Sequence, residues 1–169
     1  GQVGDATTIN RRTPVTVQGG VSFATVRGGA LNTCALTSAG AAYCWGNGAN
    51  GRLGNGDMLD RLTPAPVAGG ITFASITTLV DHACGLTAAG VAYCWGYNLG
   101  QIGDGTRIDR VLPTLVDGGI AFKSLIAGWE RTCGFTSANL LYCWGYNVYG
   151  QLGDGTAEDR LSPILIAPL

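Results

Sequence analysis

Residues 34–46 read Cys-Ala-Leu-Thr-Ser-Ala-Gly-Ala-Ala-Tyr-Cys-Trp-Gly, and close copies of this stretch occupy residues 84–96 and 133–145. In each copy, two short apolar runs flank a connection of small residues that ends in Gly or, in the third copy, in Asn139. A three-residue connection whose last member tolerates a left-handed backbone is typical of a β-hairpin, and Asn is the usual replacement for Gly there. The stretch therefore predicts the same hairpin three times along the chain.

The segments between the hairpins repeat with the same period. The string Gly-Gln-Val-Gly-Asp of residues 1–5 recurs in related form at residues 51–55, 100–104 and 150–154. Two more strands per unit are expected, around residues 23–26 and 14–17 and at their repeats. A period near 50 residues is typical of solenoids and propellers, whose units do not bury their apolar surface alone. We therefore expect an all-β chain of propeller-type blades with four antiparallel strands each, in three repeats plus a partial fourth at residues 150–169.

Counting strands gives the expected blade boundaries. Complete blades fall at residues 21–67, 71–116 and 120–166, which leaves residues 1–20 as an extra latch segment with a spare copy of the fourth strand. Three blades are too few to close a ring, because propellers typically have about four to eight. The two end faces would then be exposed and apolar. The chain is therefore expected to be an obligate homo-oligomer, either a ring or a head-to-tail filament.

Composition excludes several classes of protein. Lys and Arg total 10 and Asp and Glu total 11, a formal net charge of −1, which argues against binding nucleic acid through a broad basic surface. Hydrophobic residues make up 46% of the chain and charged residues 12%, so it is not a disordered charged tail. No apolar run approaches the ~18 residues of a membrane span. The 28 glycines follow no collagen-like period and are expected in turns.

Six cysteines form three pairs with identical spacing: Cys34 and Cys44, Cys84 and Cys94, Cys133 and Cys143. Counting residue by residue around each hairpin places the two members directly opposite each other, which is compatible with a cross-strand disulfide. Two alternatives stay open, namely free buried thiols and zinc, although this spacing matches no common zinc motif. Disulfides would indicate a secreted or extracellular protein. The first residues contain no charged-then-apolar leader, so any signal segment is expected to have been removed or to lie outside the sequence.

The hairpin string, followed by Gly-(Gln/Arg)-x-Gly-(Asp/Asn), resembles the repeat of the regulator of chromosome condensation (RCC1-type) family. It is most similar to the cysteine-containing versions found in secreted and other extracellular proteins. The resemblance covers essentially the whole chain and implies a β-propeller. The family includes nucleotide-exchange factors, enzyme-inhibitor propellers and binding modules, so the resemblance does not choose a function.

No catalytic arrangement is recognisable in the sequence, and no metal site or cofactor is expected. The Gly-Asp-Gly-Thr segments at 103–106 and 153–156 lack the residues of a phosphate or calcium loop and are interpreted as tight turns. The Asp-Arg pairs at 60–61, 109–110 and 159–160 recur in phase and are expected to clamp neighbouring units. The in-phase Trp45, Trp95 and Trp144 are expected in the core.

Binding residues are expected where the units differ, because repeat scaffolds keep packing positions and vary exposed loops. These positions precede the hairpin or follow its Trp-Gly, and all are expected on one rim: Leu31, Asn32, Asp81, His82, Trp129, Glu130, Arg131, Tyr97, Tyr146 and Tyr149. Trp129 has no aromatic counterpart in the other units, which suits a binding anchor. The alternative is that Trp129 fills a gap in its loop.

The leading functional hypothesis is a non-enzymatic extracellular module that associates with itself through its blades. The alternative is a lectin-like or inhibitor-like propeller that recognises a glycan or a protein through the rim, where aromatic rings are suited to stacking on sugars. An enzyme is a remote third reading. Guanine-nucleotide exchange is disfavoured because the expected disulfides point away from the cytosol.

Overall fold

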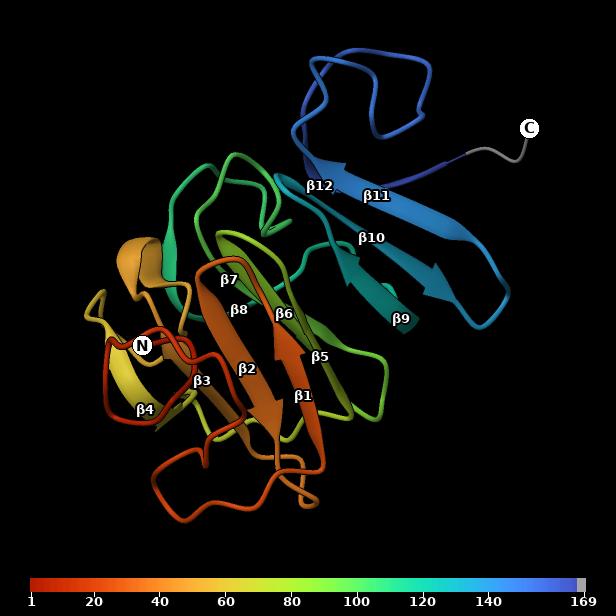
Figure 1. Cartoon of the computed structure of the whole chain (residues 1–169). Helices are drawn as coiled ribbons and strands as arrows, with labels where there is room; N and C mark the ends of the chain where they lie inside the picture. The colour runs from red at the N-terminus through yellow and green to blue at the C-terminus, as the bar shows by residue number, and fades with distance from the viewer. Residues whose placement is uncertain (167–169) are drawn as a thin grey trace.

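A computed structural model describes residues 1–166, so the last three residues of the expected partial fourth unit lie outside the described part of the chain. These residues form three four-stranded antiparallel sheets that follow one another in chain order, β1-β2-β3-β4, β5-β6-β7-β8 and β9-β10-β11-β12 (Figure 1). The bounds are β1 Thr25–Gly28, β2 Asn32–Leu36, β3 Ala42–Gly46, β4 Arg61–Pro66, β5 Ser75–Thr78, β6 His82–Leu86, β7 Ala92–Gly96, β8 Arg110–Leu115, β9 Phe122–Ala127, β10 Arg131–Thr136, β11 Leu141–Gly145 and β12 Arg160–Leu165. A single 3₁₀ turn, η1 (Ala49–Gly51), is the one helical element among residues 1–166. The predicted all-β class with four strands per unit is confirmed.

The central hairpin of each sheet has the predicted register. Cys34 lies opposite Cys44, and the equivalent cysteines of the other two sheets are paired in the same way. All three pairs form disulfides, with Cα atoms 4.1 Å apart. That separation is typical of a position between, rather than within, the hydrogen-bonded pairs of an antiparallel ladder. The hairpin turns end at Gly40, Gly90 and Asn139, with φ of 80°, 80° and 60°, as a left-handed last residue requires.

Consecutive sheets bury a shared core. The first seam joins the disulfide and Leu36 of sheet one to Phe73, Ile76 and Trp95 of sheet two. The second seam repeats the arrangement with Leu86 of sheet two and with Phe122 and Trp144 of sheet three. The three in-phase tryptophans have exposed fractions of 2%, 0% and 0%, which confirms the prediction that they belong to the core. Sheet two therefore has one face toward the preceding sheet and one face toward the following sheet, as blades do.

The N-terminal segment departs from one prediction. Residues 14–17 were expected to form a strand, but no strand forms before Thr25. The physical reason is the absence of a neighbour, because the equivalent strands β4, β8 and β12 each pair with the third strand of their own sheet. A strand is held by its hydrogen-bonded partner, and residues 14–17 have none within residues 1–166. The N-terminus itself lies beside the first sheet (Figure 1).

Candidate functional site

Five of the predicted binding residues meet at one pocket on the third unit. Trp129, Glu130 and Arg131 lead into β10, and Tyr146 and Tyr149 follow β11. Together with Gln151 they line a pocket of about 220 Å³. The exposed fractions of Trp129 and Tyr149 are 70% and 87%, among the highest of the large apolar side chains. We call this group of residues the rim pocket.

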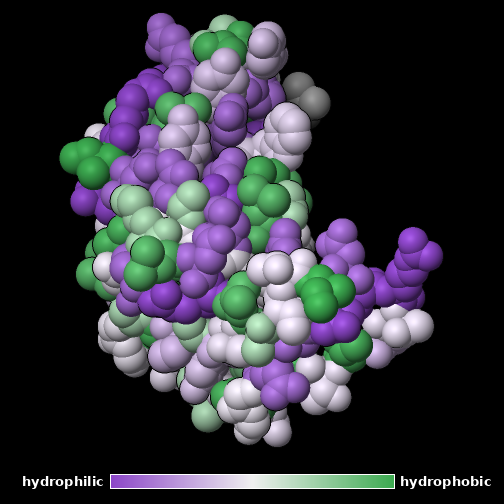
Figure 2. Space-filling model, turned by 60° about the vertical axis from the view of Figure 1, so that its left-hand side comes forward, coloured by the Kyte–Doolittle hydropathy of each residue, from purple (hydrophilic) through white to green (hydrophobic). Residues whose placement is uncertain are grey.

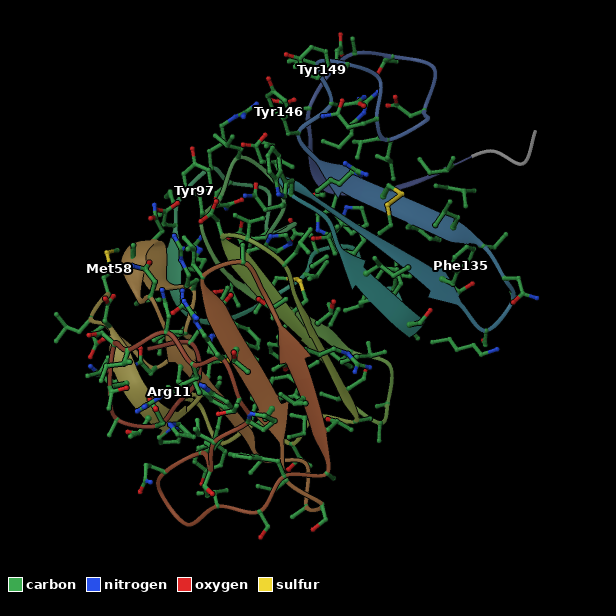
Figure 3. The ribbon with its side chains drawn as sticks, viewed as in Figure 1. Arg11, Met58, Tyr97, Phe135, Tyr146 and Tyr149 are labelled. Carbon is green, nitrogen blue, oxygen red and sulfur yellow. A yellow bond between two sulfur atoms is a disulfide. The ribbon has the colours of Figure 1, made fainter. Side chains whose placement is uncertain are left out.

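The rim pocket combines aromatic faces with one acid and one base. The rings of Tyr146 and Tyr149 contact each other edge to face, with centroids 6.3 Å apart. Partial desolvation, helped by neighbouring Tyr149 and Glu130, raises the pKa of Tyr146, so its phenol stays a neutral hydrogen-bond donor. Figure 3 shows Tyr97, Tyr146 and Tyr149 along the same edge of the molecule. Such a surface is suited to stacking and polar contacts with a macromolecule.

Three other predicted residues lie outside the rim pocket. Leu31 is 41% exposed on the first unit, and Tyr97 is half-buried on the second. The carboxylate of Asp81 is engaged by Arg52 from the preceding loop, with a 2.7 Å contact to the guanidinium Nη2. These residues are dispersed along the array, so the structure does not gather them into one site with the rim pocket.

The expectation that Asn32 and His82 emerge at the rim is corrected by the structure. Both side chains have an exposed fraction of 0% and lie in the seams between sheets. Asn32 Nδ2 donates to Thr78 Oγ1 of the next unit at 3.0 Å, and His82 Nε2 lies 2.9 Å from Thr132 Oγ1. Burial lowers the pKa of His82 to about 4, so the imidazole is neutral near neutral pH. Both residues therefore join neighbouring units rather than contact a ligand.

The loops with Gly-Asp-Gly-Thr are turns held by their own side chains. Asp154 accepts hydrogen bonds from the Thr156 amide and hydroxyl and from Arg160. Partial desolvation raises the pKa of Asp154, but the bonds from Arg160, Thr156 and Asn147 outweigh it and lower the pKa to about 2. Among residues 1–166, no group of three or more His, Cys, Asp and Glu side chains is placed to hold a metal ion.

Two of the three Asp-Arg pairs, at 109–110 and 159–160, contact a neighbouring unit through their Asp, as predicted. Asp109 Oδ2 accepts a 2.9 Å hydrogen bond from Asn50 of the preceding unit. Asp159 Oδ2 forms a 2.9 Å ion pair with Arg107 in the same way. The other oxygen of each carboxylate accepts a backbone N–H from the loop of its own unit. These two pairs thus fix their loops and join them to a neighbour, whereas Asp60 accepts a backbone N–H from Gly48 of its own unit only.

The two outer faces of the array expose residues that are buried at equivalent positions inside it. Phe135 on sheet three is 39% exposed, whereas its counterparts Leu36 and Leu86 are 3% and 4% exposed. On the opposite face of the array, Val26 is 57% exposed and its counterpart Ile76 is 4% exposed. We call these surfaces the sheet-three end face and the sheet-one end face. The sequence predicted apolar end faces without naming their residues, and the phase of Phe135 in the repeat is the signal that identifies it.

The sheet-three end face also has a hollow. A cavity of about 240 Å³ is lined in part by Ile126, Arg131, Phe135 and Leu141. Figure 3 shows Phe135 on the third sheet, well away from Tyr146 and Tyr149. Arg131 lines both this hollow and the rim pocket, so it stands at the corner between the two surfaces. Figure 2 shows apolar residues in separate small patches on the face that it displays, so this face offers no single broad apolar surface.

The chain folds into consecutive four-stranded sheets, and each sheet packs against the next through an apolar seam. This arrangement defines a repeat protein of the β-propeller class. Comparison with protein families matches residues 39–87 and 139–169 to the regulator of chromosome condensation (RCC1) repeat, and residues 122–151 to a second description of the same repeat. The chain belongs to the RCC1 repeat family. No curated protein sequence matches it significantly.

Solved structures with the same fold come from several organisms. Prp20p from Saccharomyces cerevisiae is 20% identical with a TM-score of 0.84, and the match covers 99% of this chain and 44% of that one. Human WBSCR16 is 21% identical with a TM-score of 0.76, covering 90% and 40%. The CRINKLY WD40 ectodomain of the Arabidopsis thaliana receptor kinase ACR4 is 26% identical with a TM-score of 0.51, covering 76% and 42%. The chain thus spans less than half the length of these proteins. No helix among the described residues is long and apolar enough to cross a membrane.

Proposed function

We propose that this protein is a non-enzymatic extracellular module that binds other copies of itself, end face to end face, in a ring or a filament. The observation that carries the proposal is the exposure of Phe135, whose counterparts Leu36 and Leu86 are buried by the next sheet. In each internal seam, the following sheet contributes a Phe, an aliphatic residue and a Trp. Of the same three types, the sheet-one end face presents Phe23 and Val26, whereas Trp45 is buried there under residues 1–4.

Physical complementarity supports this pairing of unlike end faces. The sheet-three end face of one copy would pack against the sheet-one end face of another copy. Inside one chain, sheet one packs against sheet two, and sheet two against sheet three, in the same way. Burial of exposed aliphatic and aromatic side chains is the main favourable term in such an association. Because the two end faces differ, joining is head to tail, which closes a ring only when the rotation per copy divides a full turn.

The three disulfides support an extracellular location, because such bonds persist in oxidising compartments. The ectodomain of the receptor kinase ACR4 shares the fold. The proposed assembly is tested by sedimentation velocity over a concentration series with Phe135→Asp. A charged side chain on the sheet-three end face should raise the dissociation constant about tenfold or more.

Met58→Asp is the matched control. Met58 is 53% exposed and lies far from Phe135 in Figure 3. This variant should associate like the unmodified chain. Equal association by all three proteins would contradict the proposed interface, and a monomeric unmodified chain would contradict self-association itself.

A second candidate function is recognition of a protein or a glycan by the rim pocket. Exposure of Trp129 and Tyr149 beside Arg131 favours it, since Trp, Tyr and Arg are enriched among residues that dominate binding energy. The solved structure of Prp20p is described together with binding to Gsp1p and histones, which supports protein partners in this fold. Pull-downs and glycan arrays with Trp129→Ala test this candidate. Loss of a partner that the unmodified chain retains supports it, and unchanged binding contradicts it.

A further inference from the structure

The second seam, between sheets two and three, contains the one histidine of the chain, and this histidine is fully buried. His82 Nε2 lies 2.9 Å from Thr132 Oγ1 of sheet three. Thr132 Oγ1 donates its single hydrogen to the carbonyl of Gln101 at 2.8 Å, so it accepts the hydrogen bond that it shares with the imidazole. The neutral His82 therefore carries its proton on Nε2, and its Nδ1 is an acceptor.

This chain of hydrogen bonds crosses the second seam more than once. Gln101 lies in the loop between β7 and β8, and its carbonyl also accepts a hydrogen bond from Trp144 Nε1 of sheet three at 2.9 Å. His82 Nδ1 is buried and has no hydrogen-bond partner among the described residues. A second proton on the imidazole would therefore place a charge and an unpaired N–H donor inside the seam. Both are costly where water is excluded.

No charged side chain offsets that cost within the part of the chain that the structure describes. The strand of His82, β6, packs against β5, β7 and β9, and His82 meets β10 through Thr132, its one hydrogen-bond partner among residues 1–166. The charged groups on the surrounding strands and loops have other contacts or are exposed: Asp81 binds Arg52, Asp104 binds Arg110, Arg107 binds Asp159, Asp109 binds Asn50, Glu130 and Arg131 line the rim pocket, and Lys123 is exposed.

The first seam has the same construction with a side chain that does not titrate at this position. Asn32 takes the place of His82, and its Nδ2 donates to Thr78 Oγ1 of sheet two at 3.0 Å. Each pair of neighbouring sheets is joined by a Gly-Gly connection, at residues 69–70 and 118–119, and all four glycines have positive φ. Such connections can absorb the backbone rotation of a hinge. The two seams therefore share a hinge and differ in the polar side chain that closes them.

We propose that the second seam is acid-sensitive, so that protonation of His82 opens it while sheets one and two stay packed. In the open state the imidazole reaches water, and the apolar core of the seam, with Phe122 and Trp144, becomes accessible. Sheet three keeps its own strand pairs and the disulfide between Cys133 and Cys143, so it moves as a unit. The proposal does not depend on the proposed self-association.

The direction and the size of the effect follow from proton linkage. Burial holds the pKa of His82 at about 4, against an ordinary value of 6.5 for an imidazole in water. Between these values the open state binds a proton that the closed state excludes, so opening is favoured as the pH falls below 6.5. From pH 7.5 to pH 5, the ratio of open to closed second seam should rise about 25-fold.

Hydrogen exchange of the full chain, followed by NMR and corrected for intrinsic rates, tests the proposal. The Phe122 N–H donates across the second seam to Gly90 O, and the Phe73 N–H donates across the first seam to Gly40 O, both at 2.9 Å. Between pH 7.5 and pH 5, protection should fall about 25-fold for the Phe122 N–H and by less than about threefold for the Phe73 N–H. An equal fall at the two positions would indicate global unfolding and overturn the proposal, as would the absence of any fall at Phe122.

His82→Gln is the matched variant, because a Gln amide offers an N–H donor to Thr132 and does not titrate in this range. In this variant, the protection of the Phe122 N–H should change by less than about threefold between the two pH values. A fall that persists would assign the opening to other groups and overturn the proposal. An NMR titration of the imidazole in the unmodified chain gives a second readout that does not require the variant to fold. We expect a midpoint well below 6.5, and a midpoint at 6.5 would show that the closed seam does not exclude the proton.

Discussion

Gly54 lies directly against the indole of Trp95, so close that a Cβ atom at position 54 would be 2.6 Å from the indole Nε1. The loop of one unit thereby covers the tryptophan of the next. Gly4 and Trp45 repeat the contact at 2.7 Å, and Gly103 and Trp144 repeat it at 2.6 Å. The equivalent Gly153 meets only a side-chain atom of Ile166, at 3.9 Å. At the sheet-three end of the array, Gly153 therefore has no tryptophan of a following sheet to cover within the described residues.

Gly54→Ala should destabilise the protein more than Gly70→Ala. Both glycines have positive φ, 66° and 62°, but nothing lies within 4 Å of a Cβ atom at position 70. The left-handed backbone alone costs about 1–2 kcal/mol for Ala. Contact with Trp95 should add about 2 kcal/mol at position 54. Urea unfolding measures both, and equal losses would show that the contact with Trp95 contributes nothing.

Trp95→Ala and Trp129→Ala should separate packing from binding. Trp95 is fully buried in the first seam, so its removal should lower the free energy of unfolding by about 3–5 kcal/mol. Trp129 is 70% exposed, and its removal should change stability by less than about 0.5 kcal/mol. Chemical denaturation followed by circular dichroism makes the comparison. A large loss of stability at position 129 would mean that Trp129 fills a gap in its loop.

Stability should fall as the pH drops from about 6.5 toward 4. His82 has a folded-state pKa of about 4 against an ordinary value of 6.5, so in this window the unfolded chain binds a proton that the folded chain excludes. The loss from this group is on the order of 3 kcal/mol. Thermal unfolding across this pH range should show the fall in the unmodified chain and a much shallower one in His82→Gln. Parallel curves for the two proteins would assign the pH dependence to other groups.

Each disulfide should stabilise the chain by restricting its unfolded state. The bond between Cys84 and Cys94 spans ten residues of sequence, a short loop worth about 2–3 kcal/mol. Replacing both cysteines by Ala should lower the free energy of unfolding by that amount while the other two bonds remain. Non-reducing peptide mapping checks the pairing. Bonds between different units would contradict the hairpin register.

The sheets could be predicted from the sequence because the same hairpin pattern occurs three times along the chain. It also placed Cys34 opposite Cys44, since residue counting around a tight turn fixes the register. The prediction of a strand at residues 14–17 was wrong, and the reason cannot be read from the local sequence. A strand requires a partner, and the partner of this one is not among residues 1–166.

Asn32 and His82 were misplaced because variability between units was interpreted as exposure. Strand alternation would have corrected this, since a residue two positions before Cys34 or Cys84 shares the face of that cysteine. In both cases that face is buried in a seam. Arg131 occupies the same position before Cys133, where the seam is open, and so it remains half-buried beside the rim pocket. One repeat position therefore has different roles inside the array and at its end.

The native mass of the full chain at micromolar concentration tests end-to-end association most directly. Light scattering under non-reducing conditions should give a mass at least twice the 17.3 kDa of one chain, falling toward one chain on dilution or with Phe135→Asp. A single stable species of 17.3 kDa across the concentration series would contradict end-to-end association.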